Sequence, residues 1–290
     1  MKKAVICGVS YQEIEGDELD GCINDAKCMK YLLTTKFNFK ESNILMLTDE
    51  KNEATICSAK IPTKYNIRKA MHWLIEDCKP GDSLVFFFAG HGTQEEDLDG
   101  DEIDGKDETI CPSDFRIHGK IVDDEINRTI VRPLPSGVTL HAIVDSCHSG
   151  TVLDLPYLCR MNRHGNYEWE DHRPKTGVRK DTSGGQVFLF SGCDDHQNSS
   201  DGAELADDVI TGAMTYSFFK SIEIGYGSTY GCLLNSMRTV IKDIDNPKSA
   251  GHLPRLFGKL KQRLLRSKYK QEPQLTSNMM FNVYKKPFTL

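Results

Sequence analysis

The sequence predicts an α/β protein, a sandwich in which helices cover both faces of a central, mostly parallel sheet of six or more strands. Two observations predict this class. Short apolar runs of strand length alternate along the chain with segments whose apolar residues recur at helical spacing. Of the 290 residues, 39% are hydrophobic, which is enough for one large domain or two small ones.

The first half of the chain supplies three buried strands and two helices. The strands are expected at residues 4–9, at 43–48 and from 84 to 91. The second helix begins after Thr63, whose side chain can cap it, and ends before Pro80. The apolar face of the first helix consists of Cys22, Ala26, Met29 and Leu33.

The second half begins with an acidic stretch, Gly92 to Asp107, which lacks an apolar period and is predicted to be an irregular loop. A short helix starts at Asp123, and Pro133 stops it. Further strands are expected at residues 139–144, 186–191 and 279–284, and helices at residues 212–224 and 229–244.

Charge is distributed unevenly. The net charge of −6 argues against a nucleic-acid-binding protein. Residues 91–125 contain thirteen Asp or Glu against three Lys or Arg, which suggests a cation site. Residues 255–270 contain seven Lys or Arg and no acid, and we interpret them as a solvated surface segment. No run of eighteen apolar residues occurs, so no membrane span is expected.

The ten cysteines show no Cys-x-x-Cys spacing, so a structural zinc site is not expected. The basic start of the chain is followed by an apolar run that is too short for a signal peptide. Free thiols are typical of a reducing compartment, so we expect a cytoplasmic protein, with access to the nucleus left open.

Two apolar strands end in chemically useful residues. Residues 142–144 lead directly into a small polar turn that holds Cys147, and residues 84–88 lead to His91, which stands between two glycines. Chemistry in open α/β sheets gathers at the carboxyl ends of strands. The pair is therefore a candidate nucleophile and base. A buried, inert cysteine is the alternative, although the Ser, His and Gly around Cys147 make a poor core segment.

These motifs carry a family resemblance. Phe88–Gly92 followed by Asp145–Gly150 resembles the catalytic pair of the caspase-like cysteine peptidases, and within them the type I metacaspases. The caspase signature Gln-Ala-Cys, with Gly two residues further on, is absent, which excludes a true caspase. Type I members usually carry a proline-rich, zinc-finger extension before the first strand, and this chain starts at that strand.

The resemblance covers nearly the whole chain and implies one caspase-like catalytic domain over residues 1–290. Its divisions are a large-subunit-like region at 1–155, an exposed linker at 156–185 and a small-subunit-like region at 186–290. The usual prodomain is expected to be lacking. Members of this family are generally monomers and take part in programmed cell death, and both properties are expectations here.

The resemblance also implies catalytic roles. Cys147 is the expected nucleophile of a cysteine endopeptidase, and His91 is the expected general base and acid. The backbone N–H groups of Gly92 and Cys147 are the expected oxyanion donors. His148 is a competing base, but neighbouring residues at a strand end usually point apart.

Metacaspases cleave proteins and peptides after Arg or Lys, which requires a negatively charged pocket. The family's pocket positions fall on Cys22, Asp25 and Asp145, with Ala89 where relatives often carry serine. Two carboxylates at one slot can bind a guanidinium through charge-assisted bonds. A solvated position on the helix surface is the alternative for Asp25.

The family's calcium site maps onto Asp107, Asp123, Asp124 and Asp154. Oxygen ligands at this density suit Ca²⁺, for which we expect weak, activating binding. The run that starts at Asp97 and includes Asp99, Asp101 and Asp104 resembles an EF-hand, but Glu102 stands where that loop needs glycine. A solvated acidic surface is the alternative.

Autoprocessing is expected within the linker, because an enzyme of this specificity would cut exposed basic residues. The candidates are Arg160, Arg163, Arg173, Lys175, Arg179 and Lys180. The basic stretch 255–270 is the alternative location. Three other interpretations of the whole chain are an inactive scaffold with this fold, a related peptidase that cleaves after Asn, and a calcium-sensing module.

Overall fold

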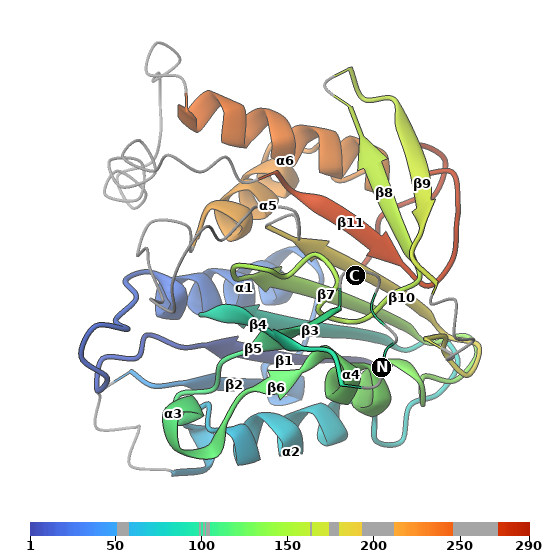
Figure 1. Cartoon of the computed structure of the whole chain (residues 1–290). Coiled ribbons are helices and arrows are strands. Elements are labelled where there is room, and N and C mark those ends of the chain that lie inside the picture. The colour runs from blue at the N-terminus through green and yellow to red at the C-terminus, as the bar shows by residue number, and fades with distance from the viewer. Residues whose placement is uncertain are drawn as a thin grey trace.

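The central sheet has eight strands in the order β2-β1-β3-β7-β10-β11-β8-β9 (Figure 1). The computed structural model describes residues 1–50, 58–98, 100, 102, 105–162, 164–173, 180–192, 212–245 and 272–290. The first five strands run parallel and the last three alternate in direction. The bounds in chain order are β1 (Lys2–Gly8), β2 (Ile44–Thr48), β3 (Ser83–Ala89), β7 (Thr139–Asp145), β8 (Tyr157–Met161), β9 (Tyr167–Asp171), β10 (Gln186–Ser191) and β11 (Gln274–Ser277).

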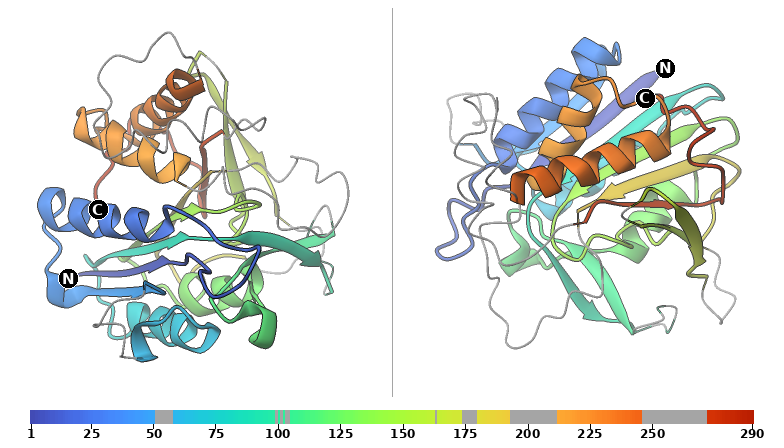
Figure 2. Two further views of the ribbon diagram at one scale, coloured as in Figure 1. Left: turned by 90° about the vertical axis from the view of Figure 1, so that its left-hand side faces the viewer. Right: turned by 90° about the horizontal axis from the view of Figure 1, so that it is seen from above.

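Helices cover both faces of this sheet, as Figure 2 shows, which confirms the predicted fold class. One face carries α1 (Cys22–Lys36), α5 (Ala213–Glu223) and α6 (Tyr230–Asp245). The other carries α2 (Lys64–Ile75) and α4 (Asp123–Ile126), which continues as η4 (Asn127–Val131). Short 3-10 turns lie at η1 (Glu41–Asn43) and η3 (Ser58–Lys60).

Two local features position these helices. The Thr63 side chain accepts a hydrogen bond of 3.3 Å from the Asn66 N–H and so caps α2, as predicted. A Cβ atom at Gly8 would lie 2.5 Å from the carbonyl oxygen of Cys22, so glycine lets α1 begin in contact with β1. The start of α1 therefore lies directly against the end of β1.

The acidic stretch at 92–107 is more ordered than predicted. It begins with β4 (Gly92–Glu96), and its end joins β5 (Lys106–Ile110). These strands and β6 (Ile121–Val122) form a second, antiparallel sheet, and α3 (Phe115–His118) lies between β5 and β6 in the chain. Polar side chains on both sides of this ribbon hide the alternation that usually reveals a strand. Asp99, Asp101 and Asp104 lie outside the described residues.

The exposed linker predicted at 156–185 was wrong over its first half. Residues 157–171 form the β8–β9 hairpin, which extends the central sheet at its edge. Leu158, Cys159 and Met161 are buried there. The hairpin pairs with β11 from the far end of the chain. Although it is rich in charge, it therefore buries its apolar side chains against the rest of the protein.

The last strand was also misplaced. It is β11, before the predicted range of 279–284, and its four residues are all buried. Met279 and Met280 follow it on the surface, with 37% and 50% of their area exposed. Phe281 packs beside the rings of Phe188 and Tyr230 from an irregular segment. The apolar run thus covers the core without forming a strand.

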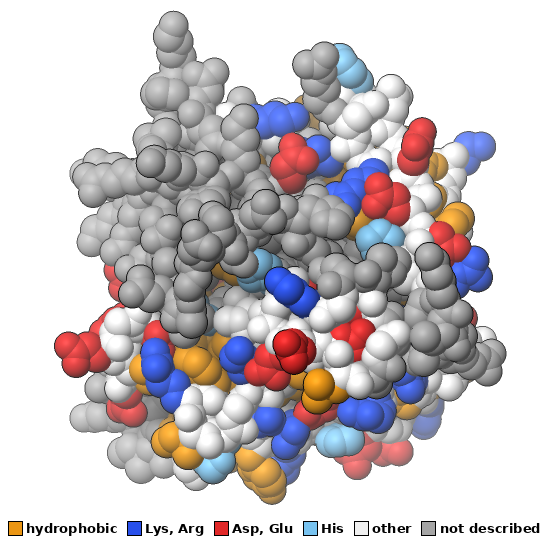
Figure 3. All heavy atoms as spheres, in the orientation of Figure 1, with side chains coloured by type: hydrophobic (Ala, Val, Ile, Leu, Met, Phe, Trp, Pro, Cys, Tyr) orange, Lys and Arg blue, Asp and Glu red, His pale blue; other side chains and the backbone are white. Residues whose placement is uncertain are grey.

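The ends of the chain lie together, since the Lys2 ammonium donates to the carbonyl oxygen of Leu290 at 2.5 Å. The face seen in Figure 3 mixes acidic and basic side chains over the described residues, without one continuous basic field. Within the described ranges, no helix combines the length and the apolar character that crossing a membrane requires.

Candidate active site

The ends of β3 and β7 bring His91 and Cys147 to one edge of the sheet. The parallel register pairs Ala89 with Asp145, and each candidate residue lies two positions beyond that pair. The Gly90 N–H donates to the Asp145 carbonyl oxygen at 3.3 Å, so the two chains stay adjacent past the last pair. The structure therefore places the two residues at matching positions on neighbouring strand ends.

Gly92 makes the closest contact with the Cys147 turn. A Cβ atom at residue 92 would lie 2.1 Å from the Cys147 carbonyl oxygen, so no other residue fits without moving the chain. This requirement places the backbone of residue 92 beside Cys147. Cys147 itself is half-buried and forms no disulfide.

The His91 ring is oriented by a backbone group. Its Nε2 atom lies 2.8 Å from the carbonyl oxygen of Asp17. A carbonyl only accepts, so Nε2 carries the proton, and in the neutral ring Nδ1 is the unprotonated nitrogen. Nδ1 is therefore the atom of His91 that can take a proton.

Tyr11 holds His91 from a second direction. The His91 N–H donates to the Tyr11 hydroxyl at 3.0 Å, and that hydroxyl donates to the Cys111 carbonyl oxygen at 2.5 Å. The rings of Tyr11 and His91 lie 4.7 Å apart between centroids. Burial raises the pKa of the Tyr11 phenol well above its ordinary value, so the hydroxyl keeps its proton.

Sequence reasoning missed Tyr11 and Asp17, although both follow β1 at the same edge of the sheet. Their position in the chain could have indicated a role, because this segment directly follows a strand that pairs with β3. Tyr11 has a left-handed backbone, with φ at 53°. The Asp49 carboxylate fixes that conformation by accepting from the N–H groups of Ser10 and Tyr11 at 2.8 and 2.7 Å.

His148 is the second imidazole beside Cys147. Its backbone is left-handed, with φ at 50°, and its buried Nδ1 atom has no hydrogen-bond partner in the described part of the chain. Burial lowers the pKa of His148, and the charge of Lys106 lowers it further. The ring is thus held towards its neutral form.

The predicted substrate pocket lies next to this edge. Cys22 and Asp25 come from the first turn of α1, Ala89 ends β3, and Asp145 ends β7. All four are buried, with 6% of Asp25 and none of Asp145 exposed. The structure therefore brings the four predicted pocket residues into one buried region and rules out a solvated Asp25.

Each pocket carboxyl has an oxygen to spare. One oxygen of Asp145, Oδ2, accepts from the N–H groups of Gly212 and Thr215 at the start of α5, at 3.2 and 2.7 Å. The other, Oδ1, and Oδ2 of Asp25 have no hydrogen-bond partner among the described residues. Two buried acceptors thus lack a hydrogen-bond donor among the residues that the structure describes.

Burial dominates the electrostatics of this pair. It raises the pKa of Asp145 to about 6, against the opposing effect of the α5 N–H groups. It raises the pKa of Asp25 well above the ordinary range, and the charge of Asp145 adds to that rise. The pair therefore resists carrying two negative charges unless a cation joins it.

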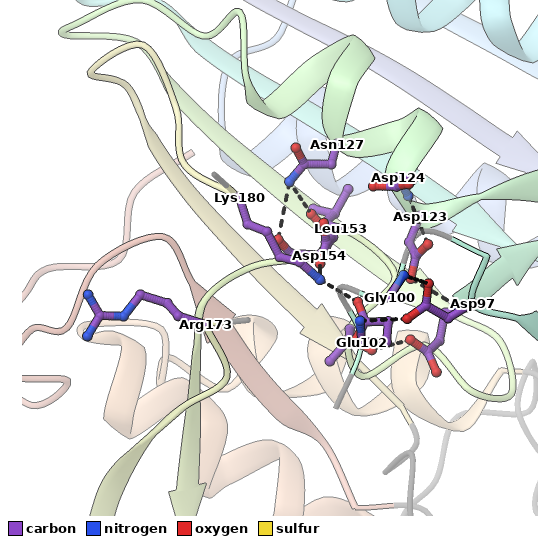
Figure 4. A network of polar contacts seen from close by, with 12 residues as sticks. Asp97, Gly100, Glu102, Asp123, Asp124, Asn127, Leu153, Asp154, Arg173 and Lys180 are labelled. Carbon is purple, nitrogen blue, oxygen red and sulfur yellow. Dashed lines mark hydrogen bonds and ion pairs between the residues drawn. The ribbon is translucent and has the colours of Figure 1, made fainter. Parts of the chain in front are cut away.

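A second acidic site lies around Lys180 (Figure 4). We call it the acidic cluster, and it consists of Glu102, Glu108, Asp123, Asp154 and Lys180. The Lys180 ammonium contacts Asp154 and binds Glu102 at 2.5 Å, and its side chain is 3% exposed. Both acids raise the pKa of Lys180, so it remains charged. The expectation that Lys180 is exposed was wrong, because the neighbouring carboxylates hold the side chain in the interior, and its cleavage stays a prediction.

The cluster contains two of the four predicted metal ligands. Asp123 and Asp154 are 2% and 3% exposed, and Glu108 is buried with them. Burial raises the pKa of Asp123 to about 10, helped by the charges of Glu108 and Asp154, and raises the pKa of Asp154 to about 8. One oxygen of Asp154, Oδ2, has no hydrogen-bond partner within the described ranges.

The other two predicted ligands are Asp124 and Asp107, each next to a buried acid of the cluster in the sequence, Asp123 and Glu108. Asp124 follows Asp123 on α4, and its N–H donates to the Asp123 carboxylate at 2.8 Å. Asp107 lies on β5, opposite Glu95. Over the residues that the structure describes, no three acidic, His or Cys side chains converge as metal ligands do. The ammonium of Lys180 supplies the positive charge there.

The remaining cleavage candidates differ in setting. Arg160 is on β8 and pairs with Glu170 across the hairpin. Arg173 pairs with Asp171 at the surface, and Figure 4 shows it well apart from the acidic cluster. Arg163, Lys175 and Arg179 lie outside the described residues.

Comparison with known proteins decides the family. A family model described as "Metacaspase, peptidase C14 domain" matches residues 2–156. The chain belongs to the metacaspase family. It is a cysteine-type endopeptidase, and its similarity to family members extends over its whole length, well beyond the matched domain.

Two relatives from Arabidopsis thaliana illustrate this metacaspase similarity. Metacaspase-2 is 56% identical over 308 residues, covering 100% of this chain and 72% of the relative. Metacaspase-1 is 54% identical over 295 residues, covering 100% and 78%. A crystal structure of protein GSU0716 from Geobacter sulfurreducens superposes with a TM-score of 0.58 at 21% identity, covering 100% and 98% of the two chains. That likeness concerns the fold alone.

Proposed function

We propose that this chain hydrolyses peptide bonds after Arg or Lys, with Cys147 as the nucleophile and His91 as the general base. One observation carries the specificity. Asp25 and Asp145 bury two carboxylate oxygens that lack a donor in the described part of the chain, beside the strand ends that hold Cys147 and His91. A cationic side chain of the substrate would supply donors and charge to both.

The chemistry follows from the His91 geometry. A thiol with an ordinary pKa of about 8.5 is only a few per cent thiolate at neutral pH, so it needs a base. His91 Nδ1 would take the Cys147 proton while Nε2–H stays on the Asp17 carbonyl, which stabilises the resulting imidazolium. The sulfur then attacks the scissile carbonyl, and backbone N–H groups at Gly92 and Cys147 would stabilise the oxyanion.

The second half of the reaction uses the same groups in reverse. The imidazolium returns its proton to the departing amine, and the acyl group remains on the Cys147 sulfur as a thioester. A water molecule then gives a proton to His91 Nδ1 and attacks the thioester, and the thiol is restored when the acid product leaves. The base thus works twice without a net gain of protons.

Arg and Lys fit the pocket because the alternative leaves buried charge without a partner. A guanidinium can donate to Asp25 and Asp145 together, whereas an ammonium offers one centre to both. An uncharged side chain leaves both acceptors desolvated and unpaired, which costs several kcal/mol relative to a cation. Ala89 adds no hydroxyl to this contact.

We propose Ca²⁺ as the cofactor, held through the predicted Asp107, Asp123, Asp124 and Asp154. Support comes from the acidic cluster, where Asp123 and Asp154 lie buried and Asp154 keeps an unpartnered oxygen. Carboxylate oxygens are the ligands that Ca²⁺ prefers, and the bound ion supplies two positive charges. Lys180 would have to leave the cluster to make room, because its ammonium contacts Asp154.

Release of Lys180 would also affect the segment before it. Residues 174–179, which include the cleavage candidates Lys175 and Arg179, join the described chain at Lys180. A cation that displaces Lys180 would therefore release the residue that directly follows the segment with these two candidates. Autoprocessing, a monomeric state, a cytoplasmic location and a role in cell death stay predictions.

Peptide hydrolysis tests the proposal. Matched peptides ending in Arg, Lys, Asn or Asp before a fluorogenic amide should be assayed with calcium and with excess chelator. We expect cleavage of the Arg and Lys peptides, dependent on calcium, and loss of turnover in Cys147→Ala and His91→Ala. Turnover by His91→Ala would transfer the base to His148, and cleavage after Asn alone would replace the assigned specificity.

A further inference from the structure

We propose that Arg116 is a positioning residue for His91 and acts through Asp17. This inference rests on the proposed role of His91 as the base. Arg116, on α3, donates to the Asp17 carboxylate through Nε at 2.6 Å and through a terminal nitrogen at 2.8 Å. The carbonyl of the same Asp17 accepts the proton of His91 Nε2. One residue thus joins the guanidinium to the imidazole.

The segment that carries Asp17 lies between β1 and α1 without regular structure. Its ends are held by the Leu19 N–H, which donates to the Ser10 carbonyl oxygen at 2.8 Å, and by Asp49, whereas the backbone bond of Asp17 itself is short-range, to Ile14. Arg116 comes from a different element, 99 positions further along the chain. A two-point guanidinium–carboxylate contact fixes both distance and orientation. It is therefore suited to hold the Asp17 carbonyl still.

The same helix reaches His91 by a second route. The Phe115 ring contacts Tyr11 edge-on at 5.9 Å, and the Tyr11 ring lies at a tilt beside the His91 ring. The Arg116 guanidinium lies over the Phe115 ring, 5.6 Å from its centroid. Losing Arg116 would therefore loosen the contact on Asp17 and leave Phe115 less constrained.

Burial explains why the effect should reach the base. Asp17 is 3% exposed, so without Arg116 its carboxylate would be buried with no counter-ion in the described part of the chain. A buried charge without a partner is unfavourable, and the cost is relieved when the group takes up a proton or when its segment moves towards water. That movement would carry the Asp17 carbonyl away from Nε2 and release His91 to rotate or to place its proton on Nδ1, where it no longer acts as a base.

The test compares Arg116→Ala and Arg116→Lys with Arg68→Ala. Arg68 makes the same two-point contact with Glu125 on the surface, so it is a matched control. The readouts are kcat and KM for an Arg peptide, and the pH profile of iodoacetamide alkylation at Cys147, followed by mass spectrometry. Alkylation needs no substrate pocket and reports how well His91 supports the thiolate.

We expect Arg116→Ala to lower kcat by about 10-fold to 100-fold, the effect of a misplaced catalytic group, with KM changed by less than about 2-fold. Its alkylation should shift to higher pH, towards an unassisted thiol. Arg116→Lys keeps the charge without the two-point contact and should fall between wild type and Arg116→Ala. If Arg116→Ala does not fold, Arg116→Lys alone provides the test.

An Arg116 variant whose kcat and alkylation profile match those of Arg68→Ala would overturn the inference, even with a lowered melting temperature. His91→Ala with wild-type turnover would instead remove the proposed function itself, so the two failures are separate. Arg68→Ala should leave both readouts unchanged.

Discussion

The proposed substrate pocket and the acidic cluster are both buried and both acidic, yet they are neutralised differently. In the cluster, the chain supplies its own cation, because Lys180 contacts Asp154 and Glu102. In the pocket, Asp145 accepts from backbone N–H groups at the start of α5, and no counter-ion contacts Asp25 or Asp145 among the described residues.

This difference points to different uses. Buried charge without a partner is unfavourable, and burial raises the pKa of both pocket carboxyls accordingly. A pocket left in that condition favours a cation brought by a substrate. A cluster with its own ammonium is stable without one, and an incoming cation must compete with Lys180.

The largest expected effect comes from neutralising the pocket. Asp25→Asn and Asp145→Asn should each lower kcat/KM for an Arg peptide by on the order of 10² to 10³, because a buried cation then loses a charged partner. Steady-state kinetics measure this. Asp77→Asn is the control, since Asp77 is exposed after α2 and has a left-handed backbone that Asn tolerates. Unchanged kinetics in the pocket variants would show that the two sites do not differ as proposed.

Removing the internal cation of the cluster should be the next largest effect. Lys180→Met should lower the free energy of unfolding by roughly 3–5 kcal/mol without calcium, because Asp154 and Glu102 lose their buried partner. Calcium should restore more stability to this variant than to wild type, since the competing ammonium is gone. Urea unfolding with calcium and with chelator measures both. Equal stability without calcium would contradict the assigned role of Lys180.

The pH dependence should separate the pocket from the thiol. Asp145, with its pKa raised to about 6, is charged above that pH and neutral below it. Cleavage of an Arg peptide should therefore fall about tenfold per pH unit below the apparent pKa of the Asp25–Asp145 pair. Alkylation of Cys147 should not follow this step, because iodoacetamide does not use the pocket. If alkylation of Cys147 followed the same pH step as peptide cleavage, the step would belong to the Cys147–His91 pair and not to the pocket.

The same shift has a consequence for stability. The folded protein holds a proton on Asp145 up to about pH 6, whereas the unfolded chain releases it near pH 4. The folded state therefore binds more protons between these values, and the contribution of Asp145 to stability should rise as the pH falls through this window. Asp145→Asn should remove that contribution from the unfolding curve measured against pH.

A surface lysine gives the smallest expected effect. Lys27 pairs with Glu50 at 2.6 Å, and their side chains are 49% and 33% exposed. Lys27→Met should cost less than about 1 kcal/mol, because water and salt screen such pairs. Urea unfolding compares it directly with Lys180→Met. A cost equal to that of Lys180 would mean that burial is not what distinguishes the cluster.

Cys147 and His91 could be found from the sequence because each follows an apolar strand, His91 between two glycines and Cys147 in a small polar turn. Their proximity follows from the parallel pairing of those two strands. The β8–β9 hairpin was missed because charged residues such as Arg160 and Glu170 interrupt its apolar ones, which is typical of a polar linker. The turn at Gly165 and the alternation around Trp169 were the available signals.

Other features could not be read from the sequence. Lys180 looks like an exposed basic residue until the fold brings Asp154 to it, and the two positions share no local pattern. Asp17 contributes its backbone carbonyl to His91, and every residue has one. Arg116 then acts on a partner 99 positions away. Such contacts depend on tertiary structure alone.

The most direct test of the pocket compares two peptides that end in Arg or in citrulline, which has nearly the same shape without the charge. We predict that kcat/KM for the Arg peptide exceeds that for the citrulline peptide by on the order of 10³, because only the cation can pair with Asp25 and Asp145. Equal rates for the two peptides would contradict the account, since the pocket would then recognise shape and not charge.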